Sequence, residues 1–293
     1  MKIGVLIKTV KYVHAQTGFD LKNNCIDPED IVRMVNPLDE VALEWALKLK
    51  DAQHDVKVVA ISLGGRYAEE GLRKSVAMGA DQALHLQWEE PEKLDAAALS
   101  EILAGTCKRE NFDLILCGAT AIDSNEGLEG PYLAERLAIP HLSSIVEISL
   151  IDGNRRLKVQ RVVERGDRQL LECTLPALLT VQKGSVVPRY PTLAGFLRAE
   201  KSVVTAVQPE SVGISAAGLV KCNLTETVGY CSPKPKKTRS VSPTPLSAAE
   251  RVELMVNRDA SRAKEGGMVV DGRSEEMFAH LTKVLEKAGV LKR

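Results

Sequence analysis

Apolar runs of strand length alternate along the first half of this chain with stretches in which apolar residues recur at helical spacing. The strand candidates are Ile3–Ile7, Val56–Leu63, Ala83–Leu86 and Leu114–Cys117. The helical patterns between and after them run from Val41 to Leu49, Leu72 to Ala77, Ala97 to Leu103 and Tyr132 to Leu137. Such alternation is typical of βαβ units. It predicts an α/β fold whose mainly parallel sheet has helices on both faces and binds ligands beyond the carboxyl ends of its strands.

After the last of these helical patterns, alternating strands replace the strand-helix repeat. Residues 157–163 alternate between apolar and polar side chains, residues 166–167 are a turn signal, and residues 169–172 form a second run. These runs predict an antiparallel hairpin added to the parallel sheet. The short apolar run of residues 177–181 predicts one more buried strand.

From about residue 187 to the end the chain is rich in proline and lysine, most densely at residues 231–237. Such a composition disfavours a compact core, so the sequence predicts a long C-terminal arm. The arm ends in a predicted helix with Gly289 as its C-cap. The apolar face of that helix is formed by Met277, Leu281, Val284 and Leu285.

Charge balance and cysteine usage restrict the partners and the compartment. Lys+Arg and Asp+Glu each number 39, so there is no net basic field for nucleic acid and we expect no nucleic-acid partner. The sequence contains no run of about 18 apolar residues, so we do not expect a membrane-embedded protein. The six cysteines show no CxxC and no metal-ligand spacing. We therefore expect no metal site and a reducing compartment, either the cytoplasm or, in a eukaryote, the mitochondrial matrix.

The segment from Gly118 to Pro131 is the richest candidate for a binding loop, because it connects a predicted strand to a predicted helix. Its glycines and small residues let backbone N–H groups approach a phosphate, and Pro131 suits the first turn of the following helix. From the spacing alone, an ordinary connecting loop is an equal alternative. The segment lacks the GxxxxGK[ST] motif, so nucleotide hydrolysis is not expected.

A second loop, Asn-Pro-Leu-Asp-Glu at residues 36–40, precedes the first predicted helix. Proline at the start and acidic residues in the first turn are typical of a helix N-terminus, so capping alone explains this loop. The loop also lies beyond the carboxyl end of the first predicted strand. The alternative interpretation is therefore that it lines the same ligand cleft as residues 118–131.

Motifs of hydrolases and transferases are missing from the sequence. We find no nucleophile elbow, no HExxH, no paired histidines and no close carboxylate pair within an apolar pattern. The five histidines are scattered, so each is expected to be a surface or core residue. We predict no catalytic residue in this chain.

Several segments, in order from residue 1 to about 201, resemble the β subunit of electron-transfer flavoproteins. They read IGVLIKTV, NPLDEVALEWALKLK, LRKSVAMGAD, DLILCGATAID, GPYLAERL and VVERGDRQLLECTLPALLTV. The last is the most specific, since the family pattern has a basic residue, an acid three positions later, and Leu-Pro before a buried strand. Arg161, Glu164, Leu175 and Pro176 match it, whereas Arg165 stands where the family usually has a small or acidic residue.

The resemblance implies a Rossmann-like fold of the adenine-nucleotide α-hydrolase type and a heterodimer with an α subunit. In that family the α subunit carries the redox FAD, while the β subunit shapes the other wall of the flavin site and binds AMP. Carried over to this sequence, the nucleotide-binding residues are Leu6, Asn36, Pro37, Leu38, Asp39, Ala68, Gly118, Ala119, Thr120, Ala121, Ile122, Asp123, Ser124, Asn125, Glu126, Gly127, Leu128 and Glu129. Asp39 and Asp123 are candidate acceptors for ribose hydroxyls, or caps of their loops.

Residues 187–201 resemble the family's partner-recognition loop, with a simple linker as the alternative. Leu193 stands in the place of the apolar anchor that docks on acyl-CoA dehydrogenases, a weak contact of the helix-in-groove kind. The further candidate contacts are Tyr190, Phe196 and Leu197. Glu164 pairs in the family with a basic residue of the mobile FAD domain.

The resemblance thus divides the chain into three parts. Residues 1–186 form the α/β nucleotide-binding domain, residues 187–201 the recognition loop, and residues 202–293 a C-terminal arm that packs on the α subunit. The implied function is that of an electron carrier without substrate chemistry of its own. It takes electrons from acyl-CoA dehydrogenase-type flavoenzymes and passes them to a membrane quinone oxidoreductase.

Two other functions stay open at this point. Some family members hold a second FAD in place of AMP and split the electrons of NADH between two acceptors. The tetrapeptide Gly127-Leu128-Glu129-Gly130 matches neither the AMP pattern nor the pattern of those members. A carboxylate at Glu129 repels a nearby phosphate unless it points away. The other alternative is an adenine-nucleotide-binding module without redox work, which has no need of the hairpin with Arg161 and Glu164.

Overall fold

The computed structural model describes residues 1–13, 19–20, 25–26, 31–53, 55–151, 153, 156–212, 216–225 and five positions between 278 and 285. The chain divides into two compact units, Met1–Ser232 and Pro233–Arg293. In the second unit, the described residues Phe278, Ala279, Leu281, Thr282 and Leu285 are helical. Of the predicted terminal helix, Met277, Val284 and Gly289 lie outside the described residues, as do residues 226–277 of the predicted arm.

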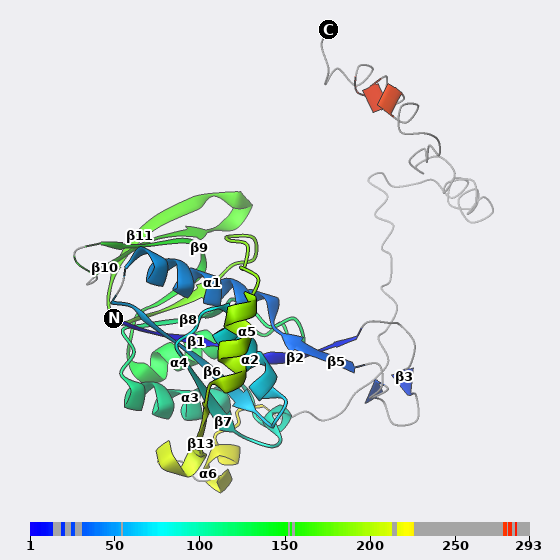
Figure 1. The fold of residues 1–293 in the computed structure, drawn as a ribbon, viewed down its shortest axis with the longest axis vertical. Helices are drawn as coiled ribbons and strands as arrows, with labels where there is room; N and C mark the ends of the chain where they lie inside the picture. Colours follow the sequence, from blue (N-terminus) through cyan, green and yellow to red (C-terminus); the bar gives the residue numbers. More distant parts are fainter. Residues whose placement is uncertain are drawn as a thin grey trace, which may run out of the picture. The chain divides into compact units, whose positions relative to one another are not determined.

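A nine-stranded sheet forms the centre of the first unit, with the strand order β11-β10-β9-β12-β8-β1-β6-β7-β13 (Figure 1). Its strands are β1 (Lys2–Leu6), β6 (Lys57–Gly64), β7 (Gln82–Gln87), β8 (Leu114–Gly118), β9 (His141–Ile151), β10 (Arg156–Val162), β11 (Arg168–Thr174), β12 (Ala177–Val181) and β13 (Val204–Val207). The seven neighbouring strands β9-β12-β8-β1-β6-β7-β13 pair in parallel. Strands β10 and β11 add antiparallel pairs at the β9 edge. This confirms the mainly parallel α/β sheet and the appended hairpin that the sequence predicts.

Helices cover both faces of the sheet because strand side chains alternate between two apolar cores. On one face, Ile3 and Val5 pack with α1 (Pro37–Ala52) and α2 (Ala68–Met78). On the other, Val59 and Ile61 pack with α3 (Ala96–Glu110) and α4 (Glu129–Leu137). Helix α5 (Leu193–Lys201) lies against α2, and α6 (Ala216–Lys221) lies against α3. The remaining turns are the short helices η2 (Pro91–Lys93), η3 (Glu164–Gly166) and η4 (Pro209–Val212). Among the described helices, none combines the length and the apolar character needed to cross a membrane.

The chain changes its direction of travel across the sheet at β1. It passes from β1 to β6 and β7 on one side, and then crosses back to β8 and β12 on the other. In open α/β sheets ligands bind at such a crossover, in the crevice beyond the carboxyl ends of the flanking strands. The loops that follow β1 and β8 are therefore the expected site.

Three features add to the fold that the sequence predicts. A hairpin of β2 (Thr9–Val13) and β5 (Ile31–Val35) follows β1, and the short strands β3 (Phe19–Asp20) and β4 (Cys25–Ile26) pair with each other. Strand β9 breaks the period of two. Ser144 has a φ of 59°, and the register shifts between Leu142 and Ile145 against β12 and between Ile145 and Glu147 against β10. Helix α5 and strand β13 lie in the first compact unit, beyond the predicted boundary at residue 186.

Candidate functional site

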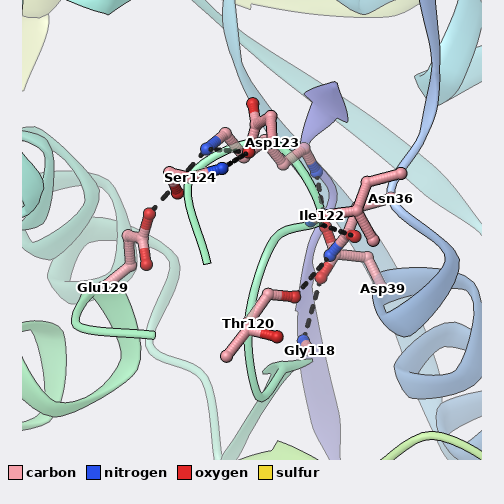
Figure 2. Close-up of polar contacts among 9 residues, drawn as sticks. Asn36, Asp39, Gly118, Thr120, Ile122, Asp123, Ser124 and Glu129 are labelled. Atoms are coloured by element: carbon pink, nitrogen blue, oxygen red, sulfur yellow. Dashed lines mark hydrogen bonds and ion pairs between the residues drawn. The ribbon is translucent and has the colours of Figure 1, made fainter. Parts of the chain in front are cut away.

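Three loops meet at the carboxyl edge of the sheet, where β1 and β8 are neighbours. Lys8 follows β1, residues 36–39 lead into α1, and residues 118–129 connect β8 to α4. Figure 2 shows the polar groups that join these loops. The fold thus brings most of the predicted nucleotide-binding residues together, although Asp39 and Gly118 are 79 positions apart in the sequence.

Asp39 joins the ends of the two central strands. Its Oδ2 accepts a hydrogen bond from the Lys8 N–H at 2.8 Å, and its Oδ1 accepts one from the Gly118 N–H at 2.9 Å. Asp39 is 5% exposed, and burial raises its pKa to about 7 against the lowering effects of those two donors, Asn36 and the Lys8 charge. Since both carboxylate oxygens already bind backbone N–H groups, this geometry corresponds to the loop-cap interpretation of Asp39.

Asn36 holds the middle of the long loop. Its Nδ2 donates to the Thr120 carbonyl at 3.0 Å, and its Oδ1 accepts from the Ile122 N–H at 3.3 Å (Figure 2). Its own backbone N–H donates to the Lys8 carbonyl at 2.9 Å, and the residue is buried. Asn36 therefore fixes the shape of the loop, since both polar atoms of its amide bind loop backbone groups.

Two glycines of the loop are required by close approach or by backbone conformation. A Cβ atom on Gly118 would lie 2.6 Å from Asp39 Oδ1. Gly127 has a φ of 64° and Asn125 a φ of 54°, which places both in the left-handed region. Among the described residues, the N–H groups of residues 126–129 have no hydrogen-bond partner. This turn therefore presents free backbone donors of the kind that bind a phosphate.

Lys8 places a cation at this site, although it is not among the site residues predicted from the sequence. Its Nζ lies 3.0 Å from Asp123 Oδ1 and 4.0 Å from Glu129 Oε1. Asp123 Oδ1 also accepts the Ser124 N–H at 2.7 Å, and Glu129 is the first residue of α4. Figure 2 shows Asp123, Ser124 and Glu129 together on one side of the loop. A basic residue directly after the first strand was the available signal, because that position faces the crossover.

The remaining predicted residues lie on the same edge of the sheet. Leu6 ends β1, Ala68 begins α2 after β6, and both are buried. Pro37 and Leu38 are the first residues of α1. The long loop also contains Ala119, Thr120, Ala121 and Glu126, together with the exposed apolar side chains of Ile122 and Leu128.

The side chains of this site are suited to binding a ligand and less to nucleophilic chemistry. Cys117, next to Gly118 in β8, is a buried thiol whose pKa is raised well above its usual value, chiefly by burial and further by the charges of Asp39 and Glu129. A thiol in that state is a poor nucleophile at neutral pH. Within the described part of the chain, the structure contains no group of three or more His, Cys, Asp and Glu side chains placed to hold a metal ion.

A second candidate surface lies on α5 and the segment before it. Tyr190 is 92% exposed and Leu193 77% exposed, and Phe196 and Leu197 are more than half exposed. The segment forms a helix, because the Thr192 hydroxyl caps it by accepting the Gly195 N–H at 3.0 Å. Of the apolar side chains predicted to contact a partner, Leu193, Phe196 and Leu197 are thus exposed on α5, and Tyr190 is exposed just before it.

Helix α1 holds the segment that leads into α5. The Arg189 side chain binds the buried Glu44 carboxylate through Nε and Nη2, both at 2.9 Å, and its backbone N–H donates to the same carboxylate at 3.0 Å. Its Nη2 also lies 2.7 Å from Asp51 Oδ2. One residue after Glu44, the Trp45 Nε1 donates to the Ser185 hydroxyl at 3.0 Å. The segment that precedes the exposed surface is thus anchored on helix α1.

Glu164 lies in the turn between the two strands of the appended hairpin. It is the first residue of η3, and it is exposed. The following Arg165, where the chain departs from the family pattern, has a left-handed φ of 63°. Among the described residues, Glu164 forms no ion pair.

A family model and several similar proteins point to the same protein family. A family model described as "Electron transfer flavoprotein domain" matches residues 26–212. An electron transfer flavoprotein subunit beta of Bacillus subtilis is 32% identical over 228 residues, which cover 78% of this chain and 87% of the relative. The protein of the same name from Megasphaera elsdenii is 31% identical over 95% of this chain and 98% of its own. A caffeyl-CoA reductase-Etf complex subunit CarD of Acetobacterium woodii is 33% identical over 75% and 83%.

Proposed function

This chain belongs to the electron-transfer flavoprotein β-subunit family, and from that premise we propose that it is the nucleotide-binding half of a heterodimeric electron carrier. Its α subunit holds the redox FAD, and this chain forms the facing wall. Electrons enter from acyl-CoA dehydrogenase-type flavoenzymes and leave to a membrane quinone oxidoreductase. The carrier works in the cytoplasm or a mitochondrial matrix, and this chain catalyses no reaction by itself.

The observation that carries the nucleotide part of the proposal is the turn at residues 126–129. Its free N–H groups and the Lys8 ammonium lie at the crossover of the sheet, where α/β folds bind nucleotides. Asn36 and Asp39 hold the loop in place through hydrogen bonds to the backbone of Thr120 and Gly118. AMP therefore suits the site as a structural ligand, since its phosphate needs backbone donors and no catalytic base.

Partner contacts are assigned to the two exposed features described above. The apolar side chains of Leu193, Phe196 and Leu197 present a small patch to a groove on the dehydrogenase, a contact suited to transient binding. Glu164, which is exposed and forms no ion pair with a described residue, is available to a basic side chain of the FAD domain.

A second candidate is a flavoprotein that binds a second FAD in this pocket and oxidises NADH. The observation in its favour is Glu129, whose carboxylate lies at the start of α4 beside Lys8. That acid disfavours the phosphate of AMP at this point and is compatible with a nucleotide whose phosphates lie elsewhere.

Co-purification with the α partner tests the proposal. The heterodimer is denatured, and the released nucleotides are separated by chromatography and counted per heterodimer. One FAD and one AMP support the structural-AMP carrier, and two FAD support the second candidate. A heterodimer that releases no flavin would exclude both.

A further inference from the structure

The acidic side chains around Lys8 bear on the charge of the ligand that this site accepts. Lys8 is the only basic residue among positions 8, 36–39 and 118–129. Its Nζ is already bound to Asp123 Oδ1 at 3.0 Å and lies 4.0 Å from Glu129 Oε1. One positive charge therefore faces two carboxylates, and any phosphate that reaches Lys8 competes with both.

Glu129 occupies the position where a helix attracts an anion. It is the first residue of the nine-residue helix α4, whose N-terminus has no side-chain cap. The unpaired N–H groups and the positive end of the helix dipole favour a negative group at this point. The Glu129 side chain is 24% exposed and points toward Lys8. The chain thus places its own negative charge beside the donors that a ligand phosphate needs.

We propose that Glu129 determines the nucleotide specificity of this site by disfavouring a terminal phosphate at the start of α4. A phosphate monoester carries a charge of about −1.5 to −2 at neutral pH, so it is repelled by this carboxylate and gains little from a lysine that is already neutralised. The inference rests on the proposed nucleotide site. It adds that the Glu129 carboxylate offsets much of the affinity that the free N–H groups of residues 126–129 would otherwise give to the phosphate of AMP.

Calorimetric titration of the heterodimer with adenosine and with AMP tests this. The heterodimer is unfolded, freed of nucleotides and refolded with FAD, and its FAD content serves as the check on folding. The measured quantity is the ratio of the two dissociation constants, adenosine over AMP, in the wild type, in Glu129→Gln and in Glu135→Gln. Glu135 is the matched control, because it is an exposed acid on the same helix.

We expect the wild-type ratio to be small and the Glu129→Gln ratio to be at least tenfold larger, which corresponds to about 1.4 kcal/mol. The Glu135→Gln ratio should equal the wild-type ratio. Adding Lys8→Gln to Glu129→Gln should abolish the gain, because the phosphate then loses its cation.

Three results would overturn the inference. Equal ratios in the wild type and Glu129→Gln mean that Glu129 does not act on the phosphate. An equal rise in Glu135→Gln means that the effect is one of overall charge. If neither ligand binds any variant while FAD content is normal, the proposed nucleotide site itself is wrong. This result is distinguishable from the other two, because no dissociation constant can then be measured.

Discussion

Replacing Glu44 by glutamine should release the segment before α5 from helix α1. Glu44 receives three side-chain contacts and one backbone hydrogen bond from Arg189. Glutamine keeps the shape of the side chain but loses the charge and one acceptor oxygen. Among the described residues, the variant therefore leaves Asp51 as the one anionic partner of the Arg189 guanidinium.

The cost is estimated from the burial of the two partners. Breaking a buried ion pair costs about 3–5 kcal/mol, and a hydrogen bond to a charged group is worth about 1.5–3 kcal/mol. The Glu44 side chain is 5% exposed but that of Arg189 is 34% exposed, so water recovers part of the loss. We expect a loss of about 2 kcal/mol in the free energy of unfolding. For a unit of this size that corresponds to a fall of about 4–8 °C in the unfolding midpoint.

Thermal unfolding of the heterodimer, followed by tryptophan fluorescence, measures this change, because Trp45, next to Glu44 in the sequence, donates a hydrogen bond to Ser185. Asp51→Asn is the matched control. Its side chain is 60% exposed, so its pairing with Arg189 is worth at most about 1 kcal/mol. If Glu44→Gln lowers the midpoint no more than Asp51→Asn, the Glu44–Arg189 pair does not hold this segment. Weakened anchoring should also raise the KM for the dehydrogenase more than it lowers kcat.

Three further changes test the site and the docking surface. Burial raises the pKa of Asp39 from 3.8 to about 7. The stability that its protonated side chain contributes is therefore full below about pH 4 and is lost as the pH rises through about 7. Asp39→Asn should remove this pH dependence from the free energy of unfolding in urea, and a variant with the same pH dependence as the wild type would contradict it. Gly118→Ala should lower stability by about 1–3 kcal/mol, because its Cβ would lie 2.6 Å from Asp39 Oδ1; an unchanged thermal midpoint would contradict the close approach. Leu193→Ala, at a position 77% exposed, should change stability by less than about 0.5 kcal/mol yet slow reduction by the dehydrogenase. Loss of FAD in that variant would refute its docking role.

The sequence by itself determined the layers of the fold and the approximate place of the site. Ile3 and Val5 belong to a short apolar run, and Val41 to Leu49 repeat at helical spacing, so strand and helix could be distinguished by period alone. The loop at residues 118–129 could be located because it follows a buried strand and is rich in glycine. These features are local, and each can be read within a window of about 18 residues.

The tertiary structure decided what the individual polar residues do. Asp39 and Asn36 bind backbone groups of a loop that is 79 or more positions away, so they build the loop. Lys8 became part of the site only because β1 pairs with β8, which places its ammonium beside Asp123 and Glu129.

The edges of the sheet also depended on tertiary contacts. Strand β13 is four residues long and pairs with β7, and β9 contains the left-handed Ser144 that breaks its alternation. Short or bulged strands carry too weak a period to be recognised, and they are stabilised mainly by hydrogen bonds to their neighbours. Pairing between distant strands sets which side chains meet. Local periodicity carries no information about that register, and for this reason the sequence indicated the candidate loop while only the folded chain showed which charges lie beside it.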